Sequence, residues 1–156
     1  MQIREATIDD LGAVNTVCGA SDRPRWTEEM LAPMNDRIVL VVVEHGEIVG
    51  VAKTHFHSEP EGDAPAGHYL GGIVVTPGLR RRGAGSALTK ARMEWVWDRS
   101  PIVYYFANEQ NRASIRMHAA LGFRPRGRFA EIRGVTADDG QSKLILFEAS
   151  RWRISG

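Results

Sequence analysis

Short apolar segments separated by turn residues divide the chain into expected strands and helices. Residues 38–43 form a continuous, mostly β-branched run, which is typical of a strand buried on both faces. Gly46 turns the chain back into residues 48–56, so these two segments predict a hairpin. The same reasoning predicts further strands at residues 3–8, 68–75 and 102–107, from Phe123 onward, and at residues 143–147. The pattern therefore predicts about seven strands.

Helical periodicity occupies most of the spaces between these strands. We expect four helices: one from about Asp10, and the others over residues 27–34, 84–97 and 111–121. Thr27 is an N-cap residue for the second helix, and Gly122 closes the fourth. The 156 residues suit one domain, so the chain is expected to form a single mixed α/β (α+β) domain over residues 1–156.

Composition and charge exclude several classes of protein. The net charge of +1 gives no overall attraction to nucleic acid or to an anionic membrane. No apolar stretch approaches the roughly 20 residues needed to span a bilayer, and Met1–Arg4 lack the apolar core of a signal peptide. The one cysteine, Cys18, excludes an intramolecular disulfide framework and fits a reducing compartment. We expect a cytoplasmic protein with no membrane or nucleic-acid partner.

Residues 75–86 carry the clearest chemical signal. A strand ends at Pro77, three arginines (Arg80, Arg81 and Arg82) follow, and Gly83 and Gly85 precede a helical sequence. Glycines admit a close ligand, the first N–H groups of a helix bind anions, and arginines add positive charge. The segment predicts a pyrophosphate site, and the alternative is an ordinary turn followed by a solvated, basic start of a helix. It is neither a P-loop nor a dinucleotide fingerprint, and no metal is expected.

Two glycines, Gly71 and Gly72, lie inside the strand expected at residues 68–75. Glycines in the middle of a strand indicate either a β-bulge or the close approach of another backbone.

Two motifs together resemble the GCN5-related N-acetyltransferase (GNAT) superfamily. The first is Val75-x-Pro77-x-x-Arg80-x-x-Gly83-x-Gly85, and the second is Asn111-x-x-Ser114-x-x-Met117-His118-x-x-Leu121-Gly122-Phe123. The resemblance covers about residues 69–125. It implies a GNAT-like fold, with a mixed central sheet of about seven strands flanked by about four helices. It also implies a V-shaped splay between the fourth and fifth strands, where Gly71-Gly72 is well placed to form the bulge.

The resemblance implies acetyl-CoA as the acyl donor. Backbone groups of Ile73, Val74 and Val75 would pair with the pantetheine arm and the acetyl carbonyl, and the Val75 N–H would stabilise the oxyanion. Asn111 matches the family asparagine that contacts the pantetheine arm. The pyrophosphate would lie on the segment from Arg80 to Ser86, made up of Arg80, Arg81, Arg82, Gly83, Ala84, Gly85 and Ser86.

The family reaction is direct attack of a neutral amine on the thioester. His118 occupies the position of a tyrosine that protonates the departing thiolate, and an imidazolium can perform the same step. Simple packing of His118 is the alternative. Phe106 stands where some relatives carry a glutamate base. Substitute bases are His55, His57, His68, Tyr69, Tyr104 and Glu109, and bulk water could also remove the proton.

The sequence thus predicts an N-acetyltransferase that acts on a primary amine of a small molecule or protein. A non-catalytic acyl-CoA sensor or scaffold is the alternative, favoured by the missing carboxylate on the fifth strand. The resemblance allows a homodimer. Trp26 lies in a region that commonly shapes the acceptor site of this superfamily, but the acceptor itself is not specified.

Overall fold

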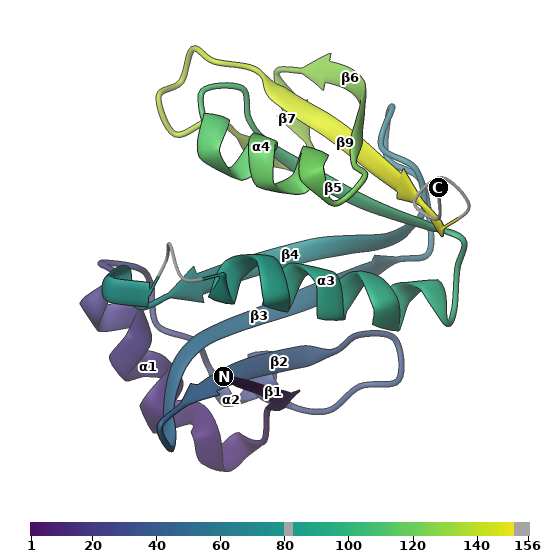
Figure 1. Cartoon of the computed structure of the whole chain (residues 1–156). Helices are drawn as coiled ribbons and strands as arrows, with labels where there is room; N and C mark the ends of the chain where they lie inside the picture. Colours follow the sequence, from purple (N-terminus) through teal and green to yellow (C-terminus); the bar gives the residue numbers. More distant parts are fainter. Residues whose placement is uncertain (80–82, 152–156) are drawn as a thin grey trace. The chain divides into compact units, whose positions relative to one another are not determined.

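The computed structural model describes residues 1–79 and 83–151, so Arg80, Arg81 and Arg82 lie outside the described residues. Its main sheet has seven strands in the order β1-β2-β3-β4-β5-β9-β6 (Figure 1). Four α-helices, α1 to α4, occur among the described residues. The predicted α/β fold class is confirmed. None of the described helices is long and apolar enough to cross a bilayer.

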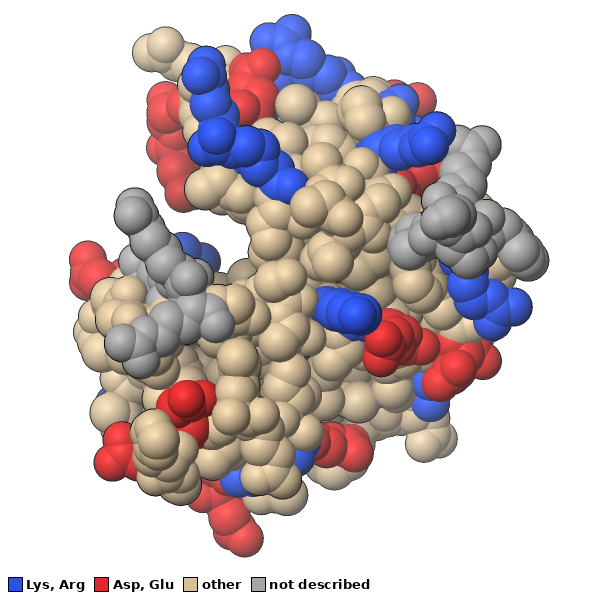
Figure 2. Space-filling model, in the orientation of Figure 1, with Lys and Arg blue, Asp and Glu red and all other residues tan. Residues whose placement is uncertain are grey.

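The chain divides into two compact units, which are described separately. The first contains Met1–His55 and Gly71–Trp95, and the second contains Phe56–Leu70 and the residues from Val96 onward. On the face that Figure 2 shows, acidic and basic side chains are interspersed among wide uncharged areas. This mixture agrees with the net charge of +1.

In the first unit, alternate residues of β2 (Val39–Glu44) enter cores on opposite faces of the sheet. Val39 and Val41 pack with α1 (Leu11–Ala20), whereas Leu40 and Val42 pack with residues of α3 (Ala84–Trp97). The period of two explains this separation. β2 pairs antiparallel with both β1 (Gln2–Glu5) and β3 (Glu47–His57), as the hairpin prediction requires.

The second helix is shorter than the sequence predicts. Thr27 is its N-cap and accepts a hydrogen bond from the Met30 N–H, but α2 covers only Glu28–Leu31 rather than residues 27–34. Ala32 precedes Pro33, and the residue before a proline is disfavoured in the helical region. Ala32 accordingly adopts an extended ψ of 134°.

The second unit is built on β5 (Ile102–Asn108), which pairs antiparallel along its whole length with β9 (Leu144–Ser150). β9 also pairs with β6 (Arg124–Phe129), and α4 (Arg112–Ala120) connects β5 to β6. β4 (Gly67–Val75) pairs parallel with β5 at His68↔Val103 and Tyr69↔Tyr104. Among the described residues this pairing is confined to the start of both strands, which is the splay expected between strands 4 and 5.

A small hairpin was missed by the sequence reasoning. β7 (Glu131–Ile132) and β8 (Val135–Thr136) are joined by Arg133 and Gly134, which have φ values of +49° and +81°. Two consecutive positive φ angles are typical of a type I′ turn. Each strand has two residues, which is too short to show the alternation that identifies a strand.

Candidate active site

The start of α3 has the form expected of an anion-binding turn. Gly83 has a φ of +85°, and its carbonyl accepts the Ala87 N–H at 2.9 Å, so it caps the helix. Apart from its neighbours in the chain, a Cβ added at Gly83 or Gly85 would meet no atom of residues 1–79 or 83–151 within 4 Å. Ala84 is buried against the sheet, which fixes the first turn. The glycines therefore leave space beside the first N–H groups of α3, where a pyrophosphate would bind.

The segment of β4 that precedes this turn is held on both faces. Val74 packs into the core with α1, whereas Ile73 and Val75 pack into the core with α3. The Val75 carbonyl accepts a hydrogen bond from Ser21 Oγ at 3.2 Å. These contacts fix the backbone that the resemblance assigns to the acetyl and pantetheine groups.

Gly71 is explained by side chains of β3. A Cβ at Gly71 would lie 2.5 Å from His55 Cδ2 and 3.2 Å from Lys53 Cγ. The sequence reasoning expected a bulge or a close backbone. The close approach is real, but side chains make it, and the bulge stays a prediction.

A fully buried arginine, Arg92, supports the same part of β4 from α3. Its guanidinium NH1 donates to the carbonyls of Lys53 at 3.0 Å and Gly71 at 3.2 Å. NH2 donates to Thr89 Oγ1, and Nε donates to the Leu88 carbonyl. Arg92 was missed from the sequence. The available signal was a charged residue one turn after Leu88, within the apolar stripe of the helix.

In the second unit, Asn111 is the N-cap of α4. Its Oδ1 accepts the Ser114 N–H at 3.4 Å, and its side chain is exposed. The asparagine therefore has a structural role of its own. The predicted contact with the pantetheine arm is a separate role, which this geometry leaves untested.

His118, on α4, is fixed by stacking and by one short hydrogen bond. Its ring lies parallel to that of Tyr105, with 3.5 Å between centroids, and it is 3% exposed. Nδ1 lies 2.8 Å from the Ser114 carbonyl oxygen. Because a carbonyl only accepts, Nδ1 carries a hydrogen, and in the neutral ring Nε2 is then unprotonated. Tyr105 is held in turn by a hydrogen bond between its hydroxyl and Ser114 Oγ.

The candidate bases fall into two groups. Glu109 accepts hydrogen bonds from Arg128 Nε and the Lys143 N–H, and these contacts lower its pKa, with Arg128 the larger cause. The Tyr69 hydroxyl donates to the Pro65 carbonyl, and burial raises its pKa. A strongly paired carboxylate and a protonated phenol are poor proton acceptors.

Among the candidate histidines, His57 is better suited to accept a proton than these two groups. Burial lowers the pKa of His57, and Arg133 lowers it further, so its ring is neutral near pH 7. His57 packs edge-on against Tyr69, and His68 is buried beside Phe56. Burial raises the pKa of Tyr104, so this phenol, like that of Tyr69, is a poor proton acceptor.

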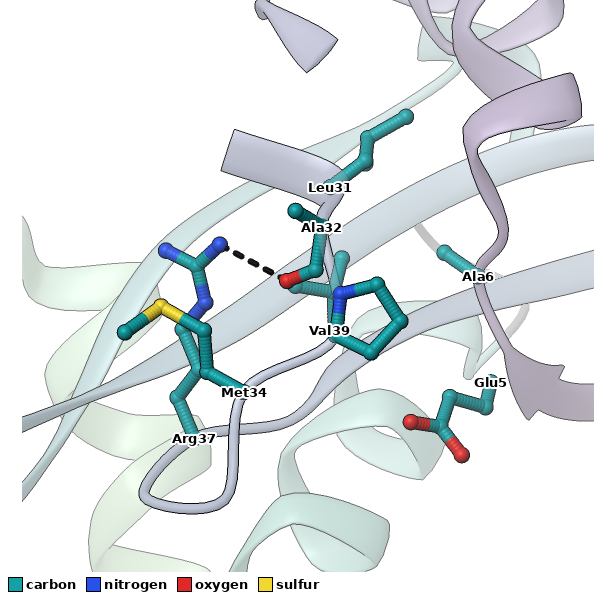
Figure 3. Close-up of a pocket in the computed structure, with 8 residues that line it drawn as sticks. Glu5, Ala6, Leu31, Ala32, Met34, Arg37 and Val39 are labelled. Carbon is teal, nitrogen blue, oxygen red and sulfur yellow. Dashed lines mark hydrogen bonds between the residues drawn. The ribbon is translucent and has the colours of Figure 1, made fainter. Parts of the chain in front are cut away.

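A shallow surface hollow lies elsewhere in the first unit, between α2 and β2. Figure 3 shows Arg37 reaching across it, where NH2 donates to the Ala32 carbonyl at 2.9 Å. None of the predicted site residues lines this hollow, and it encloses almost no volume, whereas common ligand pockets hold roughly 300–1,000 Å³. Within residues 1–79 and 83–151, no cluster of three or more side chains is suited to hold a metal ion.

Solved structures share this fold over nearly the whole chain. The ribosomal-protein-S18-alanine N-acetyltransferase of Escherichia coli is 20% identical, with a TM-score of 0.74 over 99% of this chain and 94% of that one. The putative acetyltransferase yncA of Salmonella typhimurium, solved with its cofactor acetyl-CoA, is 21% identical, with a TM-score of 0.71 over 96% and 92%. Chaetomium thermophilum Naa20, in complex with a bisubstrate analogue, is 15% identical, with a TM-score of 0.74 over 98% and 88%.

At these identities the likeness establishes the fold, and the family follows from the sequence itself. No curated protein matches the chain in sequence. The sequence model of the Acetyltransferase (GNAT) family matches residues 5–123, which include both motifs and most of the chain. The protein therefore belongs to the acetyltransferase (GNAT) family and is an acyltransferase.

Proposed function

We propose that the protein transfers the acetyl group of acetyl-CoA to a primary amine of a small molecule or protein. The neutral amine attacks the thioester carbonyl, a C–N bond forms, the C–S bond breaks, and coenzyme A leaves as the thiolate. The proton lost by the amine nitrogen goes to water or to one of the candidate bases. The supporting observation is the turn at the start of α3, where Gly83 has a φ of +85° and the Cβ positions of Gly83 and Gly85 are open. The relative solved with acetyl-CoA agrees with this donor.

The first unit supplies the proposed contacts to the donor. The cap Gly83 and the first residues of α3, Ala84, Gly85 and Ser86, would hold the pyrophosphate by their N–H groups. Arg80, Arg81 and Arg82, which precede them in the sequence, would add positive charge. Backbone groups of Ile73, Val74 and Val75 would bind the pantetheine arm and the acetyl carbonyl. In this proposal the Val75 N–H stabilises the negative charge that develops on the carbonyl oxygen during attack.

The second unit supplies Asn111 and His118. As a proton donor, His118 acts in its imidazolium form. Nδ1–H stays on the Ser114 carbonyl, and Nε2–H is the proton given to the thiolate. The parallel stack on Tyr105 keeps the ring in one plane while the proton is given up.

Thiol release tests the proposal. Purified protein is incubated with acetyl-CoA and a panel of primary amines, and free coenzyme A is measured with a thiol reagent, with acetylated product identified by mass spectrometry. Amine-dependent release supports the proposal. Binding of acetyl-CoA without release for any amine would instead indicate the sensor, an alternative that the family assignment does not support.

The expectation that the protein has no nucleic-acid partner is tested by thermal shift, in which the Tm with acetyl-CoA is compared with the Tm with a mixed oligonucleotide. Stabilisation by acetyl-CoA alone is the expected result. The cytoplasmic location and the homodimer stay predictions from the sequence and the resemblance.

A further inference from the structure

The indole of Trp26 forms a fixed platform in the first unit. The backbone N–H of Trp26 donates to Asn15 Oδ1 at 2.7 Å, and Asn15 Nδ2 donates to the Trp26 carbonyl at 3.1 Å. The side chain is 6% exposed and packs in the core with Val74. A ring held by both its backbone and its packing presents one constant surface.

Lys53 extends along the glycine pair of β4 toward this platform. Its Cγ lies 3.2 Å from the position that a Cβ of Gly71 would take, and its Cε lies 3.8 Å from that of Gly72. Trp26 Cζ2 lies 3.8 Å from the same Gly72 position, and the Lys53 ammonium is 4.8 Å from the indole centroid. Gly72 is exposed, so the cluster of Trp26, Lys53 and Gly72 reaches the surface.

The Lys53 ammonium is partly desolvated and has no anionic partner among the described residues. No carboxylate of residues 1–79 or 83–151 lies within ion-pair distance of it. Burial lowers the pKa of Lys53, and the charge of Arg37 lowers it further, so the local environment opposes the positive charge. An anion bound beside the ammonium would offset the repulsion from Arg37 and favour the charged form, whereas a second cation would add to the repulsion.

The cluster also lies close to the proposed site of reaction. Gly72 is followed directly by Ile73, Val74 and Val75, which are assigned to the acetyl group. A strand rises about 3.3 Å per residue, so Gly72 and Val74 are separated by roughly 7 Å. A small molecule of a few bonds covers that distance. An amine that attacks beside Val74 or Val75 can therefore place a second group at Lys53.

We infer that Lys53 and Trp26 form a subsite for an anionic group of the acceptor, so that the substrate is a small amine carrying a carboxylate or a phosphate a few bonds from its nitrogen. This inference rests on the proposed function. Lys53 makes the ionic contact, the indole holds the ammonium in place, and Gly72 leaves room for the incoming group. Polyamines and other amines with a second cation are poor acceptors.

Matched pairs of amines test the inference. A set of amino acids is assayed, each beside its own carboxamide, which lacks the carboxylate. O-phosphoethanolamine is compared with ethanolamine, so that a preference for carboxylate can be distinguished from one for phosphate. Wild type, Lys53→Met, Lys53→Arg and the control Lys90→Met, an exposed lysine of α3, are assayed for kcat/KM with acetyl-CoA. Since the two amines of a pair differ in intrinsic reactivity, the quantity compared is how the preference within a pair changes between variants.

We expect at least one pair in which wild type prefers the anionic member by about tenfold, the ratio of one charge-assisted contact. Lys53→Met should reduce that preference about tenfold, Lys53→Arg should retain most of it, and Lys90→Met should leave it unchanged. A preference that is the same in Lys53→Met and wild type for every pair overturns the inference. So does a general preference for the uncharged members.

Binding of the same pairs, measured by saturation-transfer NMR in the presence of coenzyme A, separates this inference from the proposed function. Binding of anionic amines that depends on Lys53, without acetylation of any amine, would retain the subsite and refute the transferase. Acetylation without dependence on Lys53 would retain the transferase and refute the subsite. Absence of both would refute both.

Discussion

Replacement of Arg92 by methionine tests whether this buried cation holds β3 and β4 together beneath the proposed acetyl site. Arg92 is 0% exposed, and its NH1 group is the donor to the carbonyls of Lys53 and Gly71. Methionine fills a similar volume and has no donor. The variant therefore removes the hydrogen bonds while keeping most of the packing.

The size of the effect follows from the two carbonyls. A buried acceptor left without its donor costs about 1–3 kcal/mol, so two cost roughly 2–6 kcal/mol. The variant no longer has to bury a charged guanidinium on folding, and this saving in desolvation free energy offsets part of the loss. We expect a net loss of about 3 kcal/mol in the free energy of unfolding. For a chain of this size, that lowers the Tm by about 10 °C.

Urea unfolding followed by circular dichroism measures the change, with the slope against denaturant checked for constancy between variants. Lys90→Met on the exposed side of the same helix is the control and should stay within about 0.5 kcal/mol of wild type. Arg92→Lys should be intermediate, since an ammonium cannot reach every acceptor of the guanidinium fork. Equal stability of Arg92→Met and wild type would refute the reasoning, because the two carbonyls would then need no donor.

Other predictions concern the proposed donor site, the proton donor and the response to acid. Gly85→Val should abolish binding of acetyl-CoA in calorimetry with little change in the free energy of unfolding. Gly83→Val should abolish binding too, and should also lose about 1–2 kcal/mol of that free energy because of its positive φ. Normal binding by both variants would contradict the pyrophosphate site at the start of α3. His118→Phe should lower kcat far more than it changes KM for acetyl-CoA, and an unchanged kcat would leave the ring a packing role only. The Arg4 contact lowers the pKa of Asp10 to about 2, so its contribution is full above about pH 4 and is lost as the pH falls through 2. Because the Arg4 side chain is 40% exposed, solvent screening limits this contribution to about 1 kcal/mol, and Asp10→Asn should remove that part of the acid dependence of urea unfolding.

The third helix and the strand at residues 38–43 were predicted closely. The third helix was expected over residues 84–97 and is Ala84–Trp97, because a glycine precedes it and its apolar stripe is regular. The strand run at 38–43 was correctly assigned to burial on both faces. The short hairpin at Arg133 and Gly134 was missed, since its strands are held by contacts that no local pattern records. One such contact joins Arg133 to the carbonyls of Glu59 and Pro65.

In the candidate site, too, contacts between distant residues could not be predicted from the sequence. Residue types that act through their own backbone, such as Gly83, are visible in a sequence, because glycine is needed where φ is positive. His118 was visible by its position in a motif, but its stack on Tyr105 and its bond to the Ser114 carbonyl were not. These contacts depend on how α4 packs on β5, which is a property of the folded unit.

Gly71 shows how much one residue type can leave undetermined. From the sequence, a glycine within a strand could equally mark a bulge or a close neighbour. In the structure its carbonyl accepts from Arg92, while the space beside its Cα is filled by His55 and Lys53. The hydrogen bond to Arg92 holds β4 against α3. Because Gly71 has no side chain to displace it, Lys53 can extend toward Trp26. A side chain at this position would clash with His55 and Lys53, so the glycine is required by the arrangement of its neighbours.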